Sequence, residues 1–547
     1  MKPHWRLGAA LILCGPALRT AAAGTPDDPR GTYFSKKAYD PHPLPDYAKL
    51  KDQLPAPILA SHPEWVALYW KAWEIAFHNF HEPEPGSHFV SQFIDAAFNK
   101  NTFLWDTCFM SMFCNVAHPL VPGIESLDNF YARQHADGEI GREIVRSTGL
   151  DYAPWVDAGG RPLFSRNGFN ADSPDSPVKY RGRPVPEPAP RLTLDAVDNP
   201  LPAWAELESY RVTGDRDRIA RVYPPLAAYY GAIRKYLRQG NGLYVTDWAS
   251  MDNSPRNRYL ANGGTAVDTS SQMVLFARQL SEMAGMLGKD RDRLAFALDA
   301  RELSGIINRL MWNPDRRFYF DLTQDGRQAP VRTVAAYWTL LAEVAPVDRA
   351  RALVQALGDP DAFGRRNQVP TLPADEKGFD PMGGYWRGSV WAPTTMMVIR
   401  GLERYGRAQQ ARQIALGNLR LMSAVLQKTG TIWENYAPDS ESQGRPAKDD
   451  FVGWSGLGPI DWLLEYALGL KPDAPDNTLD WTPDPDGRSG CRNYRFNGHV
   501  CSLEATPLGG GRFRYSVDAD EPFLIRLGRD GDWKTVNIGF GPNAWSD

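Results

Sequence analysis

The chain has 547 residues with 61 basic and 65 acidic side chains, which gives a formal net charge of −4. This near balance, without any basic run, argues against a nucleic-acid partner. Hydrophobic residues make up 43% of the chain, so a large core can form and wholesale disorder is excluded. The length allows one large catalytic domain with a smaller addition.

The N-terminus has the pattern of a secretory signal peptide. Lys2 and Arg6 precede the apolar run Leu7–Cys14, and the small residues Ala21–Gly24 follow. This pattern predicts a signal peptide over residues 1–23 and an exported protein, periplasmic or extracellular, with a buried N-terminal helix as the alternative. The apolar run is too short to span a bilayer, and no later segment reaches about 20 apolar residues. We therefore expect no membrane partner after cleavage.

Residues 24–60 are rich in Pro, Asp and Lys, which predicts an extended N-terminal arm. Over residues 61–471 the apolar residues recur at helical spacing, and Asp215, Gly288 and Gly406 are suitable end signals for helices. Helices of this length, joined by long aromatic-rich loops, favour a toroid of alternating inner and outer helices with a pocket at one end. The expected helices are residues 64–79, 105–117, 123–134, 201–213, 216–238, 267–286, 291–311, 331–343, 347–357, 389–404, 407–427 and 456–469.

Residues 159–200 form a long irregular stretch that is dense in Pro, Gly, Arg and Asp. Long structureless segments inside a compact domain are uncommon and often belong to a binding site. A disordered surface insertion is the alternative, and the sequence leaves both open.

The pattern changes again after Pro472, and residues 472–547 are predicted to form a small antiparallel β module. Asn497-Gly498 is a hairpin turn signal, and a strict two-residue turn places Cys501 opposite Tyr494. A disulfide between Cys491 and Cys501 needs a looser loop, so that pairing stays open. The expected strands include residues 492–496, 499–504, 512–517 and 523–527.

Two loop-like segments combine acidic and aromatic side chains. Residues 247–256 read DWASMDNSPR, and residues 431–436 read TIWENY. Aromatic faces can cover the apolar C–H faces of a sugar ring, and a carboxylate can act on the glycosidic oxygen or on a water. Two such loops predict a glycosidase with a pair of working carboxylates.

Five motifs occur in order along the chain: Phe103–Asp106, Trp248–Arg256, Gly383–Trp391, Trp433–Tyr436 and Gly453–Gly456. Together they resemble the (α/α)6-barrel glycosidases of the trehalase and glycoside hydrolase family 63 group. The resemblance implies a mainly α protein with an (α/α)6 toroid as its catalytic domain and inverting hydrolysis of a glycosidic bond. Many family 63 members carry a large N-terminal β domain, whereas the predicted N-terminal arm of this chain has only about forty residues. An α-glucoside, an α-mannoside or a glycosyl-glycerate compound therefore all fit as the substrate.

The resemblance assigns the two catalytic roles. Asp252 is implied as the general acid that protonates the leaving oxygen, and Glu434 as the general base that activates a water. Inversion requires the two carboxyl groups to lie about 6.5–9.5 Å apart. Asp247 is a rival acid at the start of the same loop. The expected activity is exo-hydrolysis of an α-linked disaccharide or oligosaccharide end.

The resemblance also implies a lining of aromatic and charged side chains. Asp106 is expected to bind sugar hydroxyls, with helix capping as the alternative, and Arg387 suits bidentate contacts, with a structural salt bridge as the alternative. Trp204 is equally well explained as a core residue. The expected substrate-binding residues are Phe103, Trp105, Asp106, Trp204, Glu206, Trp248, Arg256, Trp386, Arg387, Trp391, Trp433 and Trp454.

Two other functions stay open on the sequence. A polysaccharide lyase on the same barrel needs a base such as Tyr436 or His135, with Arg387 to neutralise a uronate. A non-catalytic carbohydrate-binding protein would lack one of the two carboxylates, and both are present. No cofactor is required for the chemistry. Asp449 and Asp450 are possible calcium ligands, but no EF-hand or zinc spacing is present.

Overall fold

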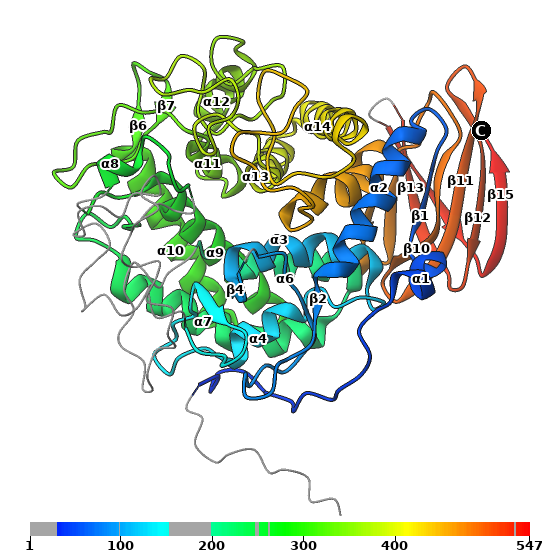
Figure 1. The fold of residues 1–547 in the computed structure, drawn as a ribbon, viewed down its shortest axis with the longest axis horizontal. Coiled ribbons are helices and arrows are strands. Elements are labelled where there is room, and N and C mark those ends of the chain that lie inside the picture. Colours follow the sequence, from blue (N-terminus) through cyan, green and yellow to red (C-terminus); the bar gives the residue numbers. More distant parts are fainter. Residues whose placement is uncertain (1–29, 98, 152–198, 247–250, 261–262, 530–531) are drawn as a thin grey trace, which may run out of the picture.

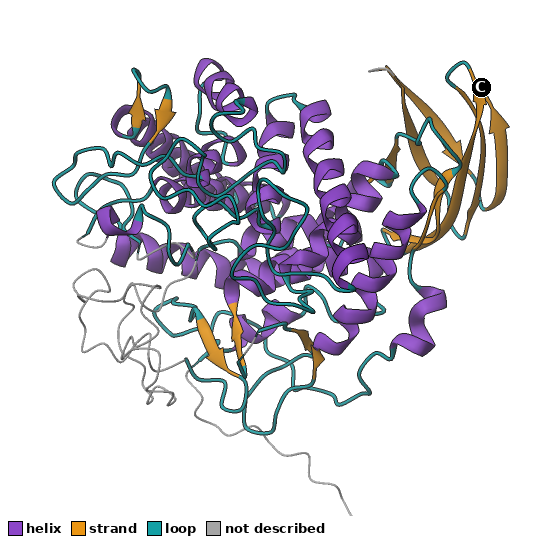
Figure 2. Cartoon of the chain, turned by 45° about the horizontal axis from the view of Figure 1, so that its top comes forward, coloured by secondary structure: helices purple, strands orange, loops and turns teal. Residues whose placement is uncertain are grey.

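The computed structural model describes residues 30–97, 99–151, 199–246, 251–260, 263–529 and 532–547. The predicted signal peptide, Asp247 and Trp248, and nearly all of the irregular stretch 159–200 lie outside these residues. Within them, a helical body is followed by a β region at the C-terminal end (Figure 1, Figure 2).

Every predicted helical range contains helix. The Asp215 carboxylate accepts the backbone N–H of Arg218 at 2.8 Å and begins α7, while Gly214, with φ of 67°, ends α6. The helices are α1 (Tyr47–Leu50), α2 (Pro63–Ala76), α3 (Leu104–Cys114), α4 (Ser126–Ala132), α6 (Pro202–Thr213), α7 (Arg216–Leu237), α8 (Asn257–Leu260), α9 (Val267–Met286), α10 (Asp290–Leu310), α11 (Trp338–Leu341), α12 (Val347–Gly358), α13 (Ala392–Arg404) and α14 (Ala408–Thr429).

Two predicted helices differ in type from the expected α-helix. In the range 331–343, a 3₁₀ turn at Val334–Tyr337 leads into the four-residue α11. In the range 456–469, the 3₁₀ turn η7 (Trp454–Leu457) leads into the π-helix η8 (Gly458–Ala467). Apolar spacing separates these helix types poorly here, because segments this short span too few turns for the difference in their periods to show.

Six helical segments contact one another in sequence around the body. They are α3, α6, α9, α11, α13 and η7, and η7 in turn contacts α3. Helices α2, α4, α7, α10 and α14 pack against members of this series or against η8. The chain thus alternates between helices of the series and helices that pack against them; Figure 1 labels most of these helices.

The C-terminal region contains two sheets. The first has the order β1-β10-β11-β12-β15 and the second the order β14-β13-β9-β8. The predicted extended arm contributes β1, which pairs antiparallel with β10, so the arm is tied to the β module. The strands of the two sheets are β1 (Ala56–Leu59), β8 (Leu470–Asp473), β9 (Thr478–Trp481), β10 (Ser489–Phe496), β11 (His499–Gly509), β12 (Arg512–Ala519), β13 (Phe523–Arg529), β14 (Asp532–Ile538) and β15 (Gly541–Ser546).

Six further strands form three short two-stranded sheets within the helical body. They pair as β2 with β3, β4 with β5, and β6 with β7. Their bounds are β2 (Phe80–His81), β3 (Phe93–Ile94), β4 (Asn101–Phe103), β5 (Glu143–Val145), β6 (Trp312–Asn313) and β7 (Phe318–Tyr319).

The β10–β11 hairpin has the predicted turn and register. Asn497 and Gly498 have φ of 49° and 75°, as a tight two-residue turn requires, and Tyr494 pairs with Cys501. Cys491 pairs with Leu503 instead, and both cysteines are buried free thiols. The looser loop that a disulfide would need is therefore not adopted.

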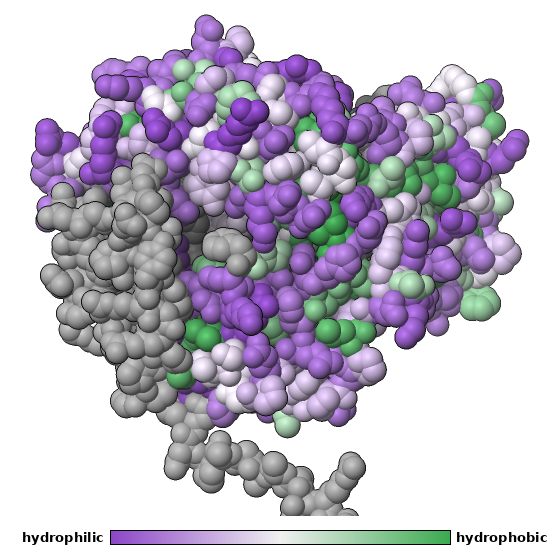
Figure 3. All heavy atoms as spheres, in the orientation of Figure 1, coloured by the Kyte–Doolittle hydropathy of each residue, from purple (hydrophilic) through white to green (hydrophobic). Residues whose placement is uncertain are grey.

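The visible face of the molecule is mostly hydrophilic, with small apolar patches between polar side chains (Figure 3). Among the described residues, none of the helices combines the length and the apolar character needed to cross a bilayer.

Candidate active site

Asp252 and Glu434 both lie on loops outside regular helices. Asp252 lies in the turn before α8, where the Asn257 amide donates to the carbonyls of Met251 and Asp252 at 2.9 and 3.0 Å. Glu434 follows α14, and its backbone N–H donates to the carbonyl of Lys448 at 2.9 Å. Local hydrogen bonds thus fix the backbone at both positions.

The Glu434 carboxylate is held at both oxygens. Tyr385 donates its hydroxyl to Oε1 at 3.2 Å, and the backbone N–H of Lys448 donates to Oε2 at 3.1 Å. The indole of Trp454 donates to the Glu434 carbonyl at 3.0 Å. With 7% of its surface exposed, the side chain is buried but has defined donors. Its orientation is therefore fixed before any substrate binds.

Burial sets the ionisation of Glu434. Its pKa is raised from 4.5 to about 7, chiefly because the carboxyl is removed from water and in smaller part because of the negative charge of Asp252. The hydrogen bonds from Tyr385 and Lys448 oppose this rise. A carboxyl with a pKa near neutrality can exchange a proton at the pH at which most enzymes work. The influence of Asp252 also places the two carboxylates within electrostatic reach of each other.

Tyr385 is the side chain on which the acidic groups converge, and the sequence reasoning did not select it. Burial raises its pKa well above the usual value, and Asp252, Glu434 and Asp106 each raise that pKa further. All three carboxyl groups thus act on the same phenol, although they are far apart in sequence. The signal in the sequence was the Gly383-Gly384 pair immediately before Tyr385, which gives that segment unusual backbone freedom.

Four predicted aromatic residues lie near Glu434 and Tyr385. The rings of Trp386 and Trp391 are stacked with centroids 4.3 Å apart, and Trp391 also contacts Trp454 at 5.6 Å. Trp433 is partly buried, and its indole donates to the Thr429 hydroxyl at 3.0 Å. Trp386, Trp391 and Trp454 thus pack as a buried aromatic cluster close to Glu434 and Tyr385, and Trp433 keeps part of its surface exposed.

The motif at Phe103–Asp106 lies at the start of α3. Phe103 is the last residue of β4, and Trp105 and Asp106 lie in the first helical turn. Asp106 is therefore inside the helix and not at its N-cap. In the first turn, its negative charge still interacts favourably with the positive end of the helix dipole. Its negative charge raises the pKa of Tyr385, so Asp106 lies within electrostatic reach of that phenol.

Arg256 does not line the pocket, and that prediction is wrong. Its guanidinium is fully buried and donates to Asp321 at 2.6 and 2.8 Å and to Asp268 at 2.9 Å. A second contact with Asp268 completes two bidentate pairs. Its remaining contact is with the sulfur of Met251 at 3.7 Å, so Arg256 anchors the loop that carries Asp252.

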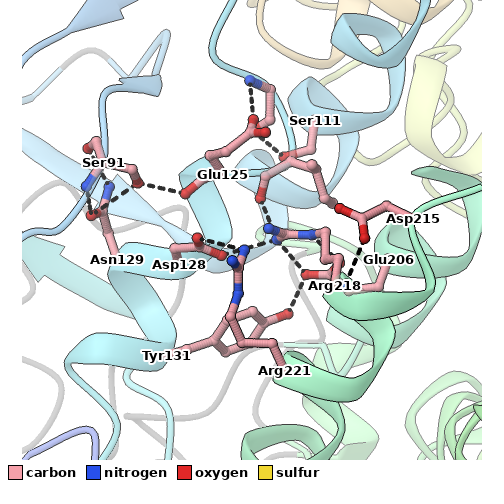
Figure 4. A network of polar contacts seen from close by, with 12 residues as sticks. Ser91, Ser111, Glu125, Asp128, Asn129, Tyr131, Glu206, Asp215, Arg218 and Arg221 are labelled. Carbon is pink, nitrogen blue, oxygen red and sulfur yellow. Dashed lines mark hydrogen bonds and ion pairs between the residues drawn. The ribbon is translucent and has the colours of Figure 1, made fainter. Parts of the chain in front are cut away.

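Glu206 is also a structural residue and not a substrate ligand. Arg218 donates to its two oxygens at 2.6 and 2.8 Å, and the Tyr131 hydroxyl donates to it at 2.9 Å. Figure 4 shows this network, in which Arg218 also pairs with Asp128 at 3.0 Å. The Glu206 side chain is fully buried.

Trp204 belongs to the core, which was the alternative to substrate binding in the sequence analysis. Only 3% of its surface is exposed, its indole donates to Glu208 at 2.9 Å, and its ring packs edge-on against Phe109 and Trp338. The prediction that Trp204 binds substrate is therefore corrected. Trp105 packs against the same Trp338, with ring centroids 6.5 Å apart.

Arg387 is exposed, and its Nε donates to the Gly378 carbonyl at 3.0 Å, which leaves guanidinium surface facing solvent.

The two side chains considered as bases for a lyase already have partners within the protein. Tyr436 is buried and its hydroxyl accepts the backbone N–H of Trp433, while the His135 ring pairs with Asp151. Among the described residues, no group of three His, Cys, Asp or Glu side chains is arranged to hold a metal ion.

Residues 185–455 match the sequence model of the mannosylglycerate hydrolase MGH1-like glycoside hydrolase domain. The chain is 31% identical over 298 residues to an uncharacterized protein of Borreliella burgdorferi. This alignment covers 52% of this chain and 61% of that protein. It is 29% identical over 192 residues to a mannosylglycerate hydrolase of Rubrobacter radiotolerans, which covers 34% of this chain and 41% of the relative. The chain thus matches less than two thirds of the length of these curated relatives.

The fold is similar to that of a solved family 63 enzyme. The mannosylglycerate hydrolase of Thermus thermophilus, solved in complex with glucose, superimposes with a TM-score of 0.54 at 21% identity. The likeness covers 72% of this chain and 99% of that structure. The matched sequence region contains both Asp252 and Glu434. The comparisons therefore support the resemblance to glycosidases of the trehalase and family 63 group that the ordered motifs predicted, and residues 185–455 match a glycoside hydrolase domain of this kind.

Proposed function

We propose that this protein hydrolyses an α-linked glucoside or mannoside with inversion of configuration, with Asp252 as general acid and Glu434 as general base. The observation that carries the proposal is the Glu434 carboxyl, which two donors orient and whose pKa burial and Asp252 raise to about 7. A base with this pKa can accept a proton from water near neutral pH.

The proposed reaction needs the two carboxyl groups on opposite faces of one sugar. Asp252 transfers its proton to the glycosidic oxygen as the bond to the anomeric carbon breaks. Glu434 removes a proton from the water that attacks from the other face, so the product has the inverted anomeric configuration. The partly exposed ring of Trp433, next to Glu434 in the chain, suits the apolar face of the sugar ring.

The proposed substrate is a small glycoside taken from its non-reducing end. The relatives that are named mannosylglycerate hydrolases make a hexosyl-glycerate the first compound to test. The series of contacts α3, α6, α9, α11, α13 and η7 supports a closed (α/α)6 toroid, in which loops at one end favour a pocket over an open groove.

The test is a hydrolysis screen of the purified protein on mannosylglycerate, glucosylglycerate, trehalose and α-linked glucose and mannose disaccharides. Asp252→Asn and Glu434→Gln should each lower kcat/KM by orders of magnitude while the protein stays folded. NMR of the first product should show the inverted anomer. Full activity in either variant, or a retained anomer, overturns the assignment.

An activated leaving group separates the two roles. A dinitrophenyl glycoside departs without protonation, so it should restore much of the activity of Asp252→Asn and none of that of Glu434→Gln. Recovery of Glu434→Gln without recovery of Asp252→Asn would instead make Glu434 the acid and Asp252 the base. An active Asp252→Asn variant on the natural linkage assigns the acid role to Asp247.

We also propose that the protein is exported. The support is the charged, apolar and small-residue order of residues 1–24. Expression of the full chain with N-terminal sequencing of the mature form tests it. A mature chain that begins near residue 24 is expected, and an intact Met1 in the cytoplasm refutes it.

A further inference from the structure

Tyr385, which donates to Glu434, has an unusual backbone conformation. Its φ is 64°, in the left-handed region, and it follows Gly383 and Gly384 with φ of 102° and 52°. Residues with a side chain rarely adopt this region, and they keep it only where neighbouring groups fix the backbone. The position of the Tyr385 hydroxyl therefore depends on whatever holds residues 384–386.

The side chain of Asn253 holds that segment on both sides of Tyr385. Its Nδ2 donates to the carbonyl of Gly384 at 3.0 Å, and its Oδ1 accepts the backbone N–H of Trp386 at 2.9 Å. The two residues bound are the immediate neighbours of Tyr385. One amide thus satisfies a carbonyl and an N–H that flank the strained residue, as no shorter or apolar side chain can do.

Asn253 is also the residue that follows Asp252. The loop with the proposed acid is therefore bonded directly to the segment whose phenol binds the proposed base. From the other side, the Trp391 indole donates to the Tyr385 carbonyl at 3.2 Å and its ring contacts the phenol edge-on at 4.9 Å. Tyr385 is fixed between Asn253 and Trp391, and its hydroxyl has one defined direction.

We propose that Asn253 is a positioning residue that couples the Asp252 loop to Glu434 through Tyr385, so that the separation and orientation of the two carboxylates are set by one side-chain amide. The inference rests on the proposed roles of Asp252 and Glu434. It extends them, since the Asn253 amide bonds to backbone groups beside Tyr385 and acts on the Glu434 carboxylate only through that phenol.

Loss of the amide should change how Glu434 titrates. The groups that act on the Glu434 carboxyl are the Tyr385 hydroxyl, the backbone N–H and ammonium of Lys448, and the Asp252 carboxylate. Of these, only the Tyr385 hydroxyl depends on the 384–386 segment. If Asn253→Ala releases this segment, the ionised form of Glu434 loses one donor, and the pKa of Glu434 rises above its present value of about 7.

The decisive experiment needs no substrate. The protein is labelled with ¹³C at glutamate carboxyl carbons, and the Glu434 signal is identified by its absence in Glu434→Gln. The titration midpoint of Glu434 should rise by about one pH unit in Asn253→Ala. Asn253→Ser, too short to bind both partners, should give the same direction and serves if the alanine variant does not fold.

Asn257→Ala is the matched control. Asn257 donates to two carbonyls of the Asp252 loop but to nothing in the 384–386 segment, so its loss should loosen the acid without raising the Glu434 midpoint. In a Tyr385→Phe background, Asn253→Ala should cause no further rise of the Glu434 midpoint, because the bond through which Asn253 lowers it is already absent.

Two results overturn the proposal: an unchanged Glu434 midpoint in folded Asn253→Ala and Asn253→Ser, or a shift that persists in full in the Tyr385→Phe background. If a substrate is hydrolysed, Asn253→Ala should also lower kcat by about 10- to 100-fold with a smaller effect on KM. If none of the tested glycosides is hydrolysed, the proposed function fails while the carboxyl titration still decides the role of Asn253.

Discussion

The ionisation of Glu434 predicts a stability effect that needs no knowledge of the substrate. Burial raises the pKa of this carboxyl from 4.5 to about 7 in the folded protein. The folded state then binds a proton more tightly than the unfolded state, so the free energy of unfolding falls as the pH rises from the unfolded pKa to the folded one. A group needed in its ionised form therefore destabilises the fold at the pH where it works.

The perturbation is Glu434→Gln, which removes the titration but keeps the shape. A pKa that rises from 4.5 to about 7 corresponds to a loss of about 2–3 kcal/mol of stability between pH 5 and pH 8 in the wild-type protein. The glutamine oxygen can accept only one of the hydrogen bonds from Tyr385 and Lys448, while its amide faces the other donor. That mismatch costs about 1 kcal/mol at every pH.

The assay is urea unfolding of both proteins at pH 5 and pH 8. Glu434→Gln should be slightly less stable than the wild type at pH 5, where only the hydrogen-bond mismatch counts. It should be more stable at pH 8, where the wild type has lost stability through ionisation of Glu434. The mismatch is the same at both pH values, so it cancels when the two stability differences are subtracted. Glu74→Gln is the control, since Glu74 is half exposed and pairs only with Lys71 on the surface of α2. A difference between the variant and the wild type that does not change with pH refutes the reasoning.

Other substitutions test the remaining contacts. Tyr385→Phe should lower kcat/KM by about 10- to 100-fold and move the acidic limb of its pH profile up by about one pH unit, and an unmoved limb contradicts the bond to Glu434. Asp252→Asn should lower the pKa of Glu434, since the charge that raises it is gone, as carboxyl NMR can measure. Arg256→Met should reduce the free energy of unfolding by about 3–5 kcal/mol in urea titration, because two buried carboxylates lose their partner. The exposed Arg387→Ala should change stability by no more than about 0.5 kcal/mol, and the reverse order of the two arginine variants refutes the assignment of Arg256.

The helices and the β10–β11 hairpin were predictable because their signals are local. Helical periodicity and end signals such as Asp215 gave each helical range, and Asn497-Gly498 set the hairpin register that pairs Tyr494 with Cys501. Pairing of the N-terminal strand β1 with β10 was not predictable. The partners lie more than 400 residues apart, and nothing in either segment selects the other.

The site shows the same division between local and distant information. Asp252 and Glu434 were selected from their own neighbours in the chain, and the structure places both near Tyr385. Arg256 and Glu206 were assigned to the pocket because they occur in or beside motifs. Their partners, Asp268, Asp321 and Arg218 among them, decide otherwise, and a sequence motif does not show which of its charges a distant residue will neutralise.

The Asp252 loop shows why functional and structural residues occur side by side in one motif. The turn before α8 lacks the hydrogen bonds of regular structure, so side chains must fix it. Arg256 ties it to Asp268 and Asp321, and Asn253 ties it to the segment of Tyr385. A carboxylate whose distance to a second carboxylate matters within an ångström needs such anchors close by in the chain, because each intervening flexible residue would blur its position. The motif therefore combines the reacting group with the residues that immobilise it, and only the structure distinguishes the two.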